Sequence, residues 1–193
     1  MRAVIWVQGC KLRCPSCIAP QSLPFHGGYV VGVDELARDL AALPIDGVTI
    51  SGGEPFEQAL ALCRLIRSTR IRRDVSFLCY TGYEFEHLQR HGTQAQLELI
   101  TELDLLIDGP YVEGQHGEDL WRGSANQRIH FLSDRHTRGI LDRASDASLI
   151  EATVTSDGSL FWMGIPPKGF TRDLLSRLAA QGITFEHRGA YDE

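Results

Sequence analysis

The chain has 193 residues, of which 43% are hydrophobic, and its formal net charge is −6. This length and hydrophobic content suffice for one domain with a substantial core. The acidic balance argues against an electrostatic nucleic-acid-binding protein, which usually presents a basic face, and no apolar stretch approaches the length that crosses a bilayer. Five cysteines, an odd number, do not fit a disulfide framework, so we expect a reducing cytoplasm as the compartment.

Strand and helix patterns alternate along residues 1–132. Short apolar runs predict five strands, at Ala3–Gln8, Gly47–Ser51, Asp74–Tyr80, Leu103–Ile107 and Ile129–Leu132. Amphipathic runs predict helices between the first four strands, at Asp34–Leu43, Phe56–Thr69, Glu84–Arg90 and Thr93–Thr101. Asp34 is the predicted N-cap of the first helix, and the predicted core face of the second consists of Leu60, Cys63, Leu65 and Ile66. This alternation favours an α/β fold with a parallel sheet.

Residues 133–193 are predicted to form a C-terminal extension of the core domain, residues 1–132. A polar linker, 133–148, comes first. The elements predicted after it are two strands, a helix and a last strand, at Leu149–Thr155, Ser159–Met163, Thr171–Ala180 and Ile183–Glu186. The two strands flank Asp157-Gly158, a strong hairpin signal, and Thr171 is the predicted helix cap. We expect this hairpin–helix–strand extension to pack on the core and not to fold independently.

Three cysteines, Cys10, Cys14 and Cys17, follow the first predicted strand at C-x3-C-x2-C spacing. They are one thiolate short of the number that a [4Fe-4S] cluster normally takes, so one iron would be free to bind a small molecule. The same thiols with His26 could instead form a structural zinc site, although no second cysteine pair follows to complete a usual zinc half-site. The other two cysteines, on a helix face and in a strand, are expected to be buried and to bind no metal.

Glycine-rich and polar segments follow the other predicted strands. Gly52-Gly53-Glu54-Pro55 follows the second strand, Thr81 the third and Asp108 the fourth. Ligands bind at the carboxyl ends of parallel strands, where glycines let the backbone approach a ligand closely and Glu54 could receive a cationic amine. Asp108 is either a carboxylate at this rim or a turn former in Asp-Gly-Pro.

A loop rich in hydrogen-bond donors precedes the fifth predicted strand. Its candidate binding residues are Arg122, Ser124 and Asn126. In one interpretation they recognise a carboxylate or a partner's main chain, with Arg122 as a bidentate donor. In the other, the loop is solvated and caps its own backbone.

The order of these segments resembles that of radical S-adenosylmethionine (SAM) enzymes that activate glycyl-radical enzymes, including the activating proteins of anaerobic ribonucleotide reductases. The segments that carry the resemblance are Trp6–Cys17, Ile50–Pro55, Thr81-Gly82-Tyr83, Leu105–Val112 and Trp121–Gln127. The resemblance covers most of residues 3–132 in one uninterrupted order.

This resemblance implies an incomplete (β/α)6 radical SAM partial barrel, followed by the C-terminal extension. It implies a [4Fe-4S] cluster on Cys10, Cys14 and Cys17, whose remaining iron binds SAM, and reductive cleavage of SAM to a 5′-deoxyadenosyl radical. The residues that it assigns to SAM or substrate are Gly52, Gly53, Glu54, Pro55, Thr81, Asp108, Arg122, Ser124 and Asn126.

The resemblance also implies partners. A large glycyl-radical enzyme would lose a hydrogen from one glycine, and a flavodoxin- or ferredoxin-type protein would supply the electron; no nucleic acid or membrane partner is expected. Two alternatives stay open. The chain could be a radical SAM enzyme that modifies a small molecule or a peptide, or a non-catalytic iron–sulfur or zinc-binding protein.

Overall fold

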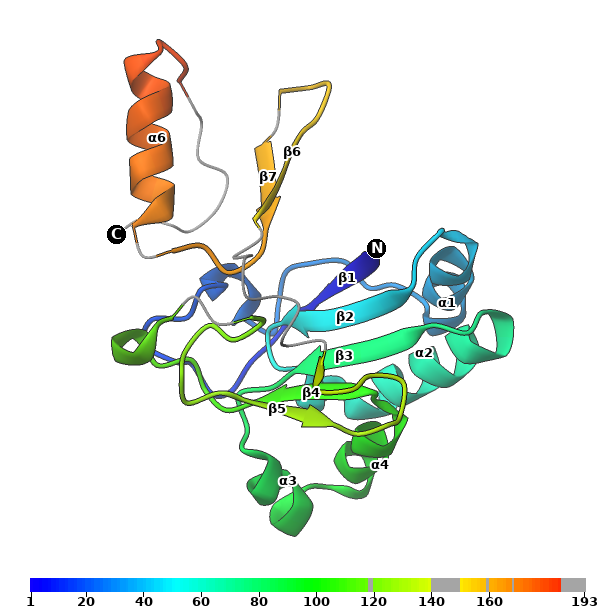
Figure 1. Ribbon diagram of the computed structural model, residues 1–193. Helices are drawn as coiled ribbons and strands as arrows, with labels where there is room; N and C mark the ends of the chain where they lie inside the picture. Colours follow the sequence, from blue (N-terminus) through cyan, green and yellow to red (C-terminus); the bar gives the residue numbers. More distant parts are fainter. Residues whose placement is uncertain (118–119, 140–149, 159, 168, 185–193) are drawn as a thin grey trace.

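The computed structural model describes residues 1–117, 120–139, 150–158, 160–167 and 169–184. A five-stranded sheet is its centre, with the order β1-β2-β3-β4-β5 (Figure 1). The strands are β1 (Arg2–Val7), β2 (Gly47–Gly52), β3 (Ser76–Tyr80), β4 (Leu105–Asp108) and β5 (Arg128–Phe131). The first four are parallel, and β5 runs antiparallel to β4. The α/β prediction is therefore confirmed.

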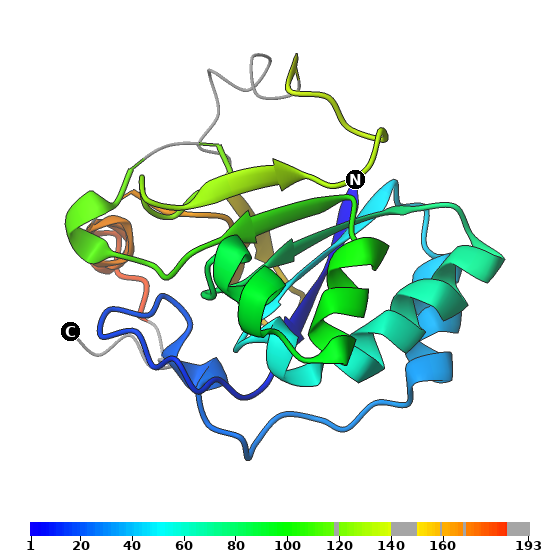
Figure 2. The same cartoon turned by 90° about the horizontal axis from the view of Figure 1, so that it is seen from below.

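Four helices connect the parallel strands and cover one face of the sheet (Figures 1 and 2). They are α1 (Val33–Ala42), α2 (Ala59–Arg72), α3 (Phe85–His91) and α4 (Gln94–Glu102). The main core lies between them and the sheet, where alternate strand residues such as Val48 and Ile50 of β2 are buried. The other face carries a smaller apolar cluster around Leu78, Leu105 and Ile107 and is otherwise open. Cys63 and Cys79 are buried in the main core, as predicted.

The antiparallel direction of β5 corrects the expectation of an all-parallel sheet. A parallel neighbour of β4 would need a crossover connection, which is usually helical. The described part of the connection between Asp108 and Arg128 contains only one short 3-10 helix, η3 (Glu113–Gln115).

Several predicted helix boundaries also need correction. α1 begins at Val33 after Gly32, so Asp34 lies in the first turn, where an acidic side chain suits the helix dipole. The second predicted helix is two elements, a 3-10 helix η2 (Pro55–Gln58) and then α2. Because α2 begins only at Ala59, its buried face differs from the predicted one, and Leu60, a predicted core residue, is exposed to solvent.

The C-terminal extension contains the predicted hairpin and helix. β6 (Glu151–Val154) and β7 (Leu160–Met163) pair antiparallel, and α6 (Phe170–Ala180) follows. Gly169, in the left-handed region, precedes α6, so Thr171 lies inside the helix and is not its cap. Of the predicted last strand, residues 183–184 are not in a strand and the rest is outside the described residues, as are residues 140–148 of the predicted linker. Among the described helices, none is long and apolar enough to span a membrane.

The two leucines of α2 give a matched test of this packing. Leu65 is 3% exposed and Leu60 is 58% exposed. We expect Leu65→Ala to lower the free energy of unfolding by about 2–5 kcal/mol, because it leaves a cavity in the core. Leu60→Ala should change it by about 0.5 kcal/mol or less. Urea denaturation of the iron-free protein measures both values, and equal losses would contradict the placement of the α2 face.

Candidate metal and cofactor site

A cavity of about 290 Å³ lies on the face of the sheet opposite the helices. Thr49 and Ser51, which line it, alternate along β2 with Val48 and Ile50 of the main core. The cavity reaches the carboxyl ends of β1, β2 and β3, where the sequence predicted a common rim. All three clustered cysteines line it, together with the backbone of Gly52 and Gly53. Segments that are far apart in the sequence therefore meet at one site.

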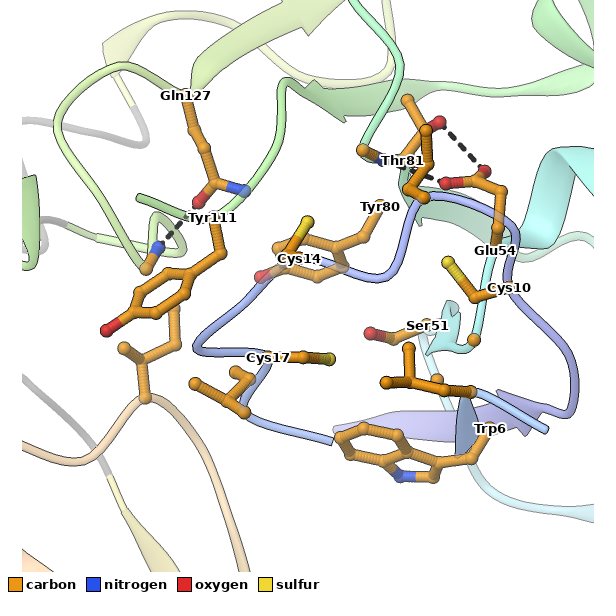
Figure 3. A pocket seen from close by; sticks show the side chains of 18 of the residues that line it. Trp6, Cys10, Cys14, Cys17, Ser51, Glu54, Tyr80, Thr81, Tyr111 and Gln127 are labelled. Atoms are coloured by element: carbon orange, nitrogen blue, oxygen red, sulfur yellow. Dashed lines mark hydrogen bonds between the residues drawn. The ribbon is translucent and has the colours of Figure 1, made fainter. Parts of the chain in front are cut away.

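The cysteine loop, residues 10–17, follows β1 and carries its three thiols along one side of this cavity (Figure 3). Two backbone hydrogen bonds fix its start: Gly9 N donates to Ser22 O over 2.8 Å, and Cys10 N donates to Leu23 O over 3.0 Å. Burial raises the pKa of the Cys17 thiol, and the neighbouring thiols of Cys14 and Cys10 raise it further. The three sulfurs are thus close enough to interact electrostatically.

The donor set fits an iron–sulfur cluster better than a zinc ion. In the described part of the chain, no group of three or more potential ligands is close enough to hold a single metal ion. A cluster does not require such closeness, since each thiolate binds a different iron, whereas the ligands of zinc surround one ion. His26 is exposed and is not among the cavity-lining residues.

The glycine-rich segment is pressed against the start of the cysteine loop. Gly53 N donates to Val7 O over 2.7 Å, and Glu54 N donates to Gly9 O over 2.8 Å. A Cβ atom on Gly53 would lie 2.3 Å from the Gly9 carbonyl oxygen, and Gly52 has a φ of 104°. Only glycine satisfies both requirements. The two glycines are thus explained by backbone packing as well as by their exposure to the cavity.

The sequence suggested that the Glu54 carboxylate could receive a cationic amine. In the structure this carboxylate is already hydrogen-bonded to groups of the protein. The Glu54 side chain is 1% exposed and accepts three hydrogen bonds, from Phe56 N (2.9 Å), Thr81 Oγ1 (2.8 Å) and Gly82 N (2.9 Å) (Figure 3). Burial raises its pKa to about 7, although these donors oppose the rise. Glu54 and Thr81 therefore join the ends of β2 and β3 at the cavity, and Pro55 is buried beneath them as the first residue of η2.

Asp108 lies at the end of β4, as predicted, but is not among the cavity-lining residues. Its fully buried carboxylate accepts from Phe85 N (2.7 Å) and from Arg128 Nε (3.2 Å), and His130 Nε2 lies 3.1 Å away. Burial alone would raise the pKa of Asp108, but His130, Arg128 and the Phe85 N–H hold it well below its ordinary value. Asp108 thus joins β4 to β5 and to the start of α3. The contact with SAM that the resemblance assigns to Asp108 stays a prediction.

The loop before β5 caps its own backbone, which is the second of the two interpretations above. Ser124 Oγ accepts from Val112 N (3.1 Å), Asn126 Nδ2 donates to Pro110 O (2.8 Å), and Arg122 Nη1 donates to Gln127 O (3.2 Å). None of the three donor-loop candidates lines the cavity. The hydrogen bonds of Arg122, Ser124 and Asn126 stabilise the loop, and their role in ligand recognition stays a prediction.

Tyr111 and Gln127 are among the cavity-lining side chains that the sequence did not assign to the site (Figure 3). Gln127 Oε1 accepts from Gly123 N (2.8 Å), and its Nε2 donates to Gly109 O (3.0 Å). This amide closes the loop around the cavity wall. The sequence shows that Gln127 is a long polar residue in a glycine-containing loop, but it does not predict whether such a side chain points into the cavity.

Comparisons with known proteins agree with this arrangement. The profile of the 4Fe-4S single cluster domain matches residues 1–130, which contain the three cysteines and the glycine-rich segment. The anaerobic ribonucleoside-triphosphate reductase-activating protein of Enterobacteria phage T4 is 32% identical over 141 residues, 69% of this chain and 85% of that protein. The chain belongs to the family of anaerobic ribonucleoside-triphosphate reductase-activating proteins.

Two further relatives extend the comparison. The anaerobic ribonucleoside-triphosphate reductase-activating protein of Escherichia coli K12 is 29% identical over 68% of this chain and 88% of its own length. A putative glycyl-radical enzyme activating enzyme of Haemophilus influenzae is 34% identical over 45% of this chain and 35% of its own length. The predicted family is confirmed. The extension, residues 133–193, lies entirely beyond the matched 4Fe-4S domain, yet Gly164 and Ile165 line the cavity.

The buried carboxylate at the end of β4 gives the next test of this family member. Asp108→Asn removes the charge that Arg128 and the Phe85 N–H share, so we expect a loss of about 2–3 kcal/mol in the free energy of unfolding. Glu86→Gln, which removes the exposed partner of the same arginine, should cost about 1 kcal/mol or less. Because the lowered pKa keeps Asp108 ionised, the loss should be present at every pH in the neutral range. Urea denaturation at several pH values tests this, and equal costs for the two variants would contradict it.

Proposed function

We propose that this chain is a radical SAM enzyme of the glycyl-radical-activating type. In this proposal Cys10, Cys14 and Cys17 hold a [4Fe-4S] cluster, and SAM occupies the iron that has no protein ligand. The observation that carries the proposal is the shared cavity: three thiols of one loop and the backbone of Gly52-Gly53 face the same space. A non-catalytic cluster protein or a zinc site would have no use for that juxtaposition.

When bound, the cluster supplies one electron to SAM, whose cleavage gives methionine and the 5′-deoxyadenosyl radical. The chain's residues bind and orient these groups. The peptide groups of Gly52 and Gly53 offer polar atoms at the cavity wall, while Glu54 and Thr81 keep that wall rigid from behind. Val4 and Trp6 of β1 and Tyr80 of β3 line the floor and exclude water from the reacting groups.

We further propose that the substrate is one glycine of a large partner enzyme. The relatives' names, which describe activation of a reductase or of glycyl-radical enzymes, support a protein substrate. The open face of the sheet supports it too, because a large partner could close what the helices leave uncovered. In this reading the strands are the described part of an incomplete (β/α)6 barrel. Residues 1–132 form the core, and residues 133–193 form an extension packed at the cavity, in a cytoplasmic protein served by a flavodoxin- or ferredoxin-type donor.

Cysteine substitutions test the metal site directly. Anaerobic reconstitution of the wild type should load about four irons per chain. Changing Cys10, Cys14 or Cys17 to Ala should reduce the iron content and the cluster absorbance to near background. Cys63→Ala and Cys79→Ala, which remove buried core thiols, should lower stability but retain the cluster. A fully loaded Cys14→Ala variant would exclude the assignment.

SAM binding and cleavage test the chemistry. SAM added to the reduced wild type should change the electron paramagnetic resonance spectrum of the cluster and give 5′-deoxyadenosine with methionine. The Cys14→Ala variant is the control. A glycyl radical should arise only when a candidate partner enzyme is present. Absence of both the spectral change and the nucleoside would remove the radical SAM assignment, whereas nucleoside without a partner radical would leave the substrate to be found elsewhere.

A further inference from the structure

Glu57 links three segments that surround the cavity, although it does not line the cavity itself. It lies in η2, three residues beyond Glu54. Lys11 Nζ donates to Glu57 Oε2 over 2.5 Å, and Tyr83 Oη donates to Glu57 Oε1 over 2.8 Å. Lys11 directly follows the first cysteine, and Tyr83 follows the end of β3. One carboxylate therefore connects the cysteine loop to the ends of β2 and β3.

This contact continues a seam of hydrogen bonds between two backbone segments. Glu54 N donates to Gly9 O, and Gln58 Nε2 donates to Gln8 O over 2.9 Å. The acceptors of both hydrogen bonds, Gln8 and Gly9, precede Cys10 in the sequence. The Lys11–Glu57 pair extends the seam past the first cysteine, into the loop itself. At the far end of that loop, Ser16 Oγ donates to Glu113 Oε2 over 2.8 Å, so the loop is held from both ends.

The pair is anchored on the Glu57 side. The Glu57 side chain is 11% exposed and is held by Tyr83, whereas Lys11 is largely exposed. Because the carboxylate of Glu57 is largely buried and held in place, it restrains the Lys11 ammonium and so the residue next to Cys10. Neither charged group lines the cavity, so neither needs to touch SAM.

We propose that Glu57 is a positioning residue, which holds the cysteine loop in its cluster-binding conformation through Lys11 and contributes to the field at the cluster. The proposal rests on the cluster assignment made above. Iron leaves when the loop opens, and the pair stabilises the closed loop. The two charges act oppositely on reduction, because a carboxylate disfavours an added electron and an ammonium favours it.

Iron release is the first measurement. Wild type, Glu57→Gln, Lys11→Met and the double variant are loaded anaerobically and mixed with a chelator. Each single variant should lose iron about fivefold faster, the effect of a partly screened ion pair on loop opening. The double variant should lose iron no faster than the singles, since the same interaction is removed once. Glu102→Gln is the matched control: this carboxylate is 18% exposed and pairs with Arg67 over 2.7 Å on the helix side of the sheet, and its removal should leave the release rate unchanged.

The midpoint potential of the cluster is the second measurement, because a merely loosened loop would shift it in the same direction in both variants. We expect Glu57→Gln to make the potential more positive and Lys11→Met to make it more negative. Wild-type release rates in both single variants, or multiplied rates in the double variant, would overturn the proposal, as would potential shifts of one sign. If wild type itself holds no iron, the cluster assignment fails and this role fails with it.

Discussion

The structure depends on one close approach, between the backbone of Gly53 and the carbonyl of Gly9. This contact brings the end of β2 against the start of the cysteine loop and leaves no room for a Cβ atom. The hydrogen bonds from Gly53 N and Glu54 N keep the two segments together. Because the loop is fixed where it leaves β1, its thiols face a cavity whose opposite wall belongs to other strands. The three thiols and the backbone of the two glycines thus face one shared cavity.

Buried carboxylates join the strand ends around this boundary. Glu54 collects donors from η2 and from the turn after β3, and Asp108 collects donors from α3 and β5. Their electrostatic environments differ. Glu54 has no cationic partner in the described contacts, so burial raises its pKa, whereas Arg128 and His130 keep the pKa of Asp108 low. Both side chains organise the rim from behind, which leaves backbone groups and cysteines to face a ligand.

The two faces of the sheet differ in what covers them: one packs against helices and the other carries the cavity. Helices α1 to α4 bury one face, and the main core lies beneath them. The other face carries the cavity, with Trp6 half exposed at its floor, and the extension supplies Gly164 and Ile165 to its edge. The cavity is therefore backed by the packed core and bordered by the extension. The extension, which lies entirely outside the matched iron–sulfur domain, thus contributes to a cavity that is otherwise lined by residues of that domain.

The sequence by itself determined the α/β class, the positions of the strands and the metal-binding character of the cysteine loop, because residue spacing and hydrophobic alternation are local properties. It also determined the family, since motif order is preserved along the chain. Only the tertiary structure decided which way polar side chains point. Asp108 lies at the predicted strand end, but its carboxylate accepts hydrogen bonds from Phe85 and Arg128, which are about 20 residues away in the sequence. Arg122 lies in the predicted loop, where it donates a hydrogen bond to the backbone of that same loop. Glu57 pairs with Lys11, which is 46 residues away in the sequence. The direction of β5 depends on the connection that follows β4. A local sequence pattern predicts neither of these features.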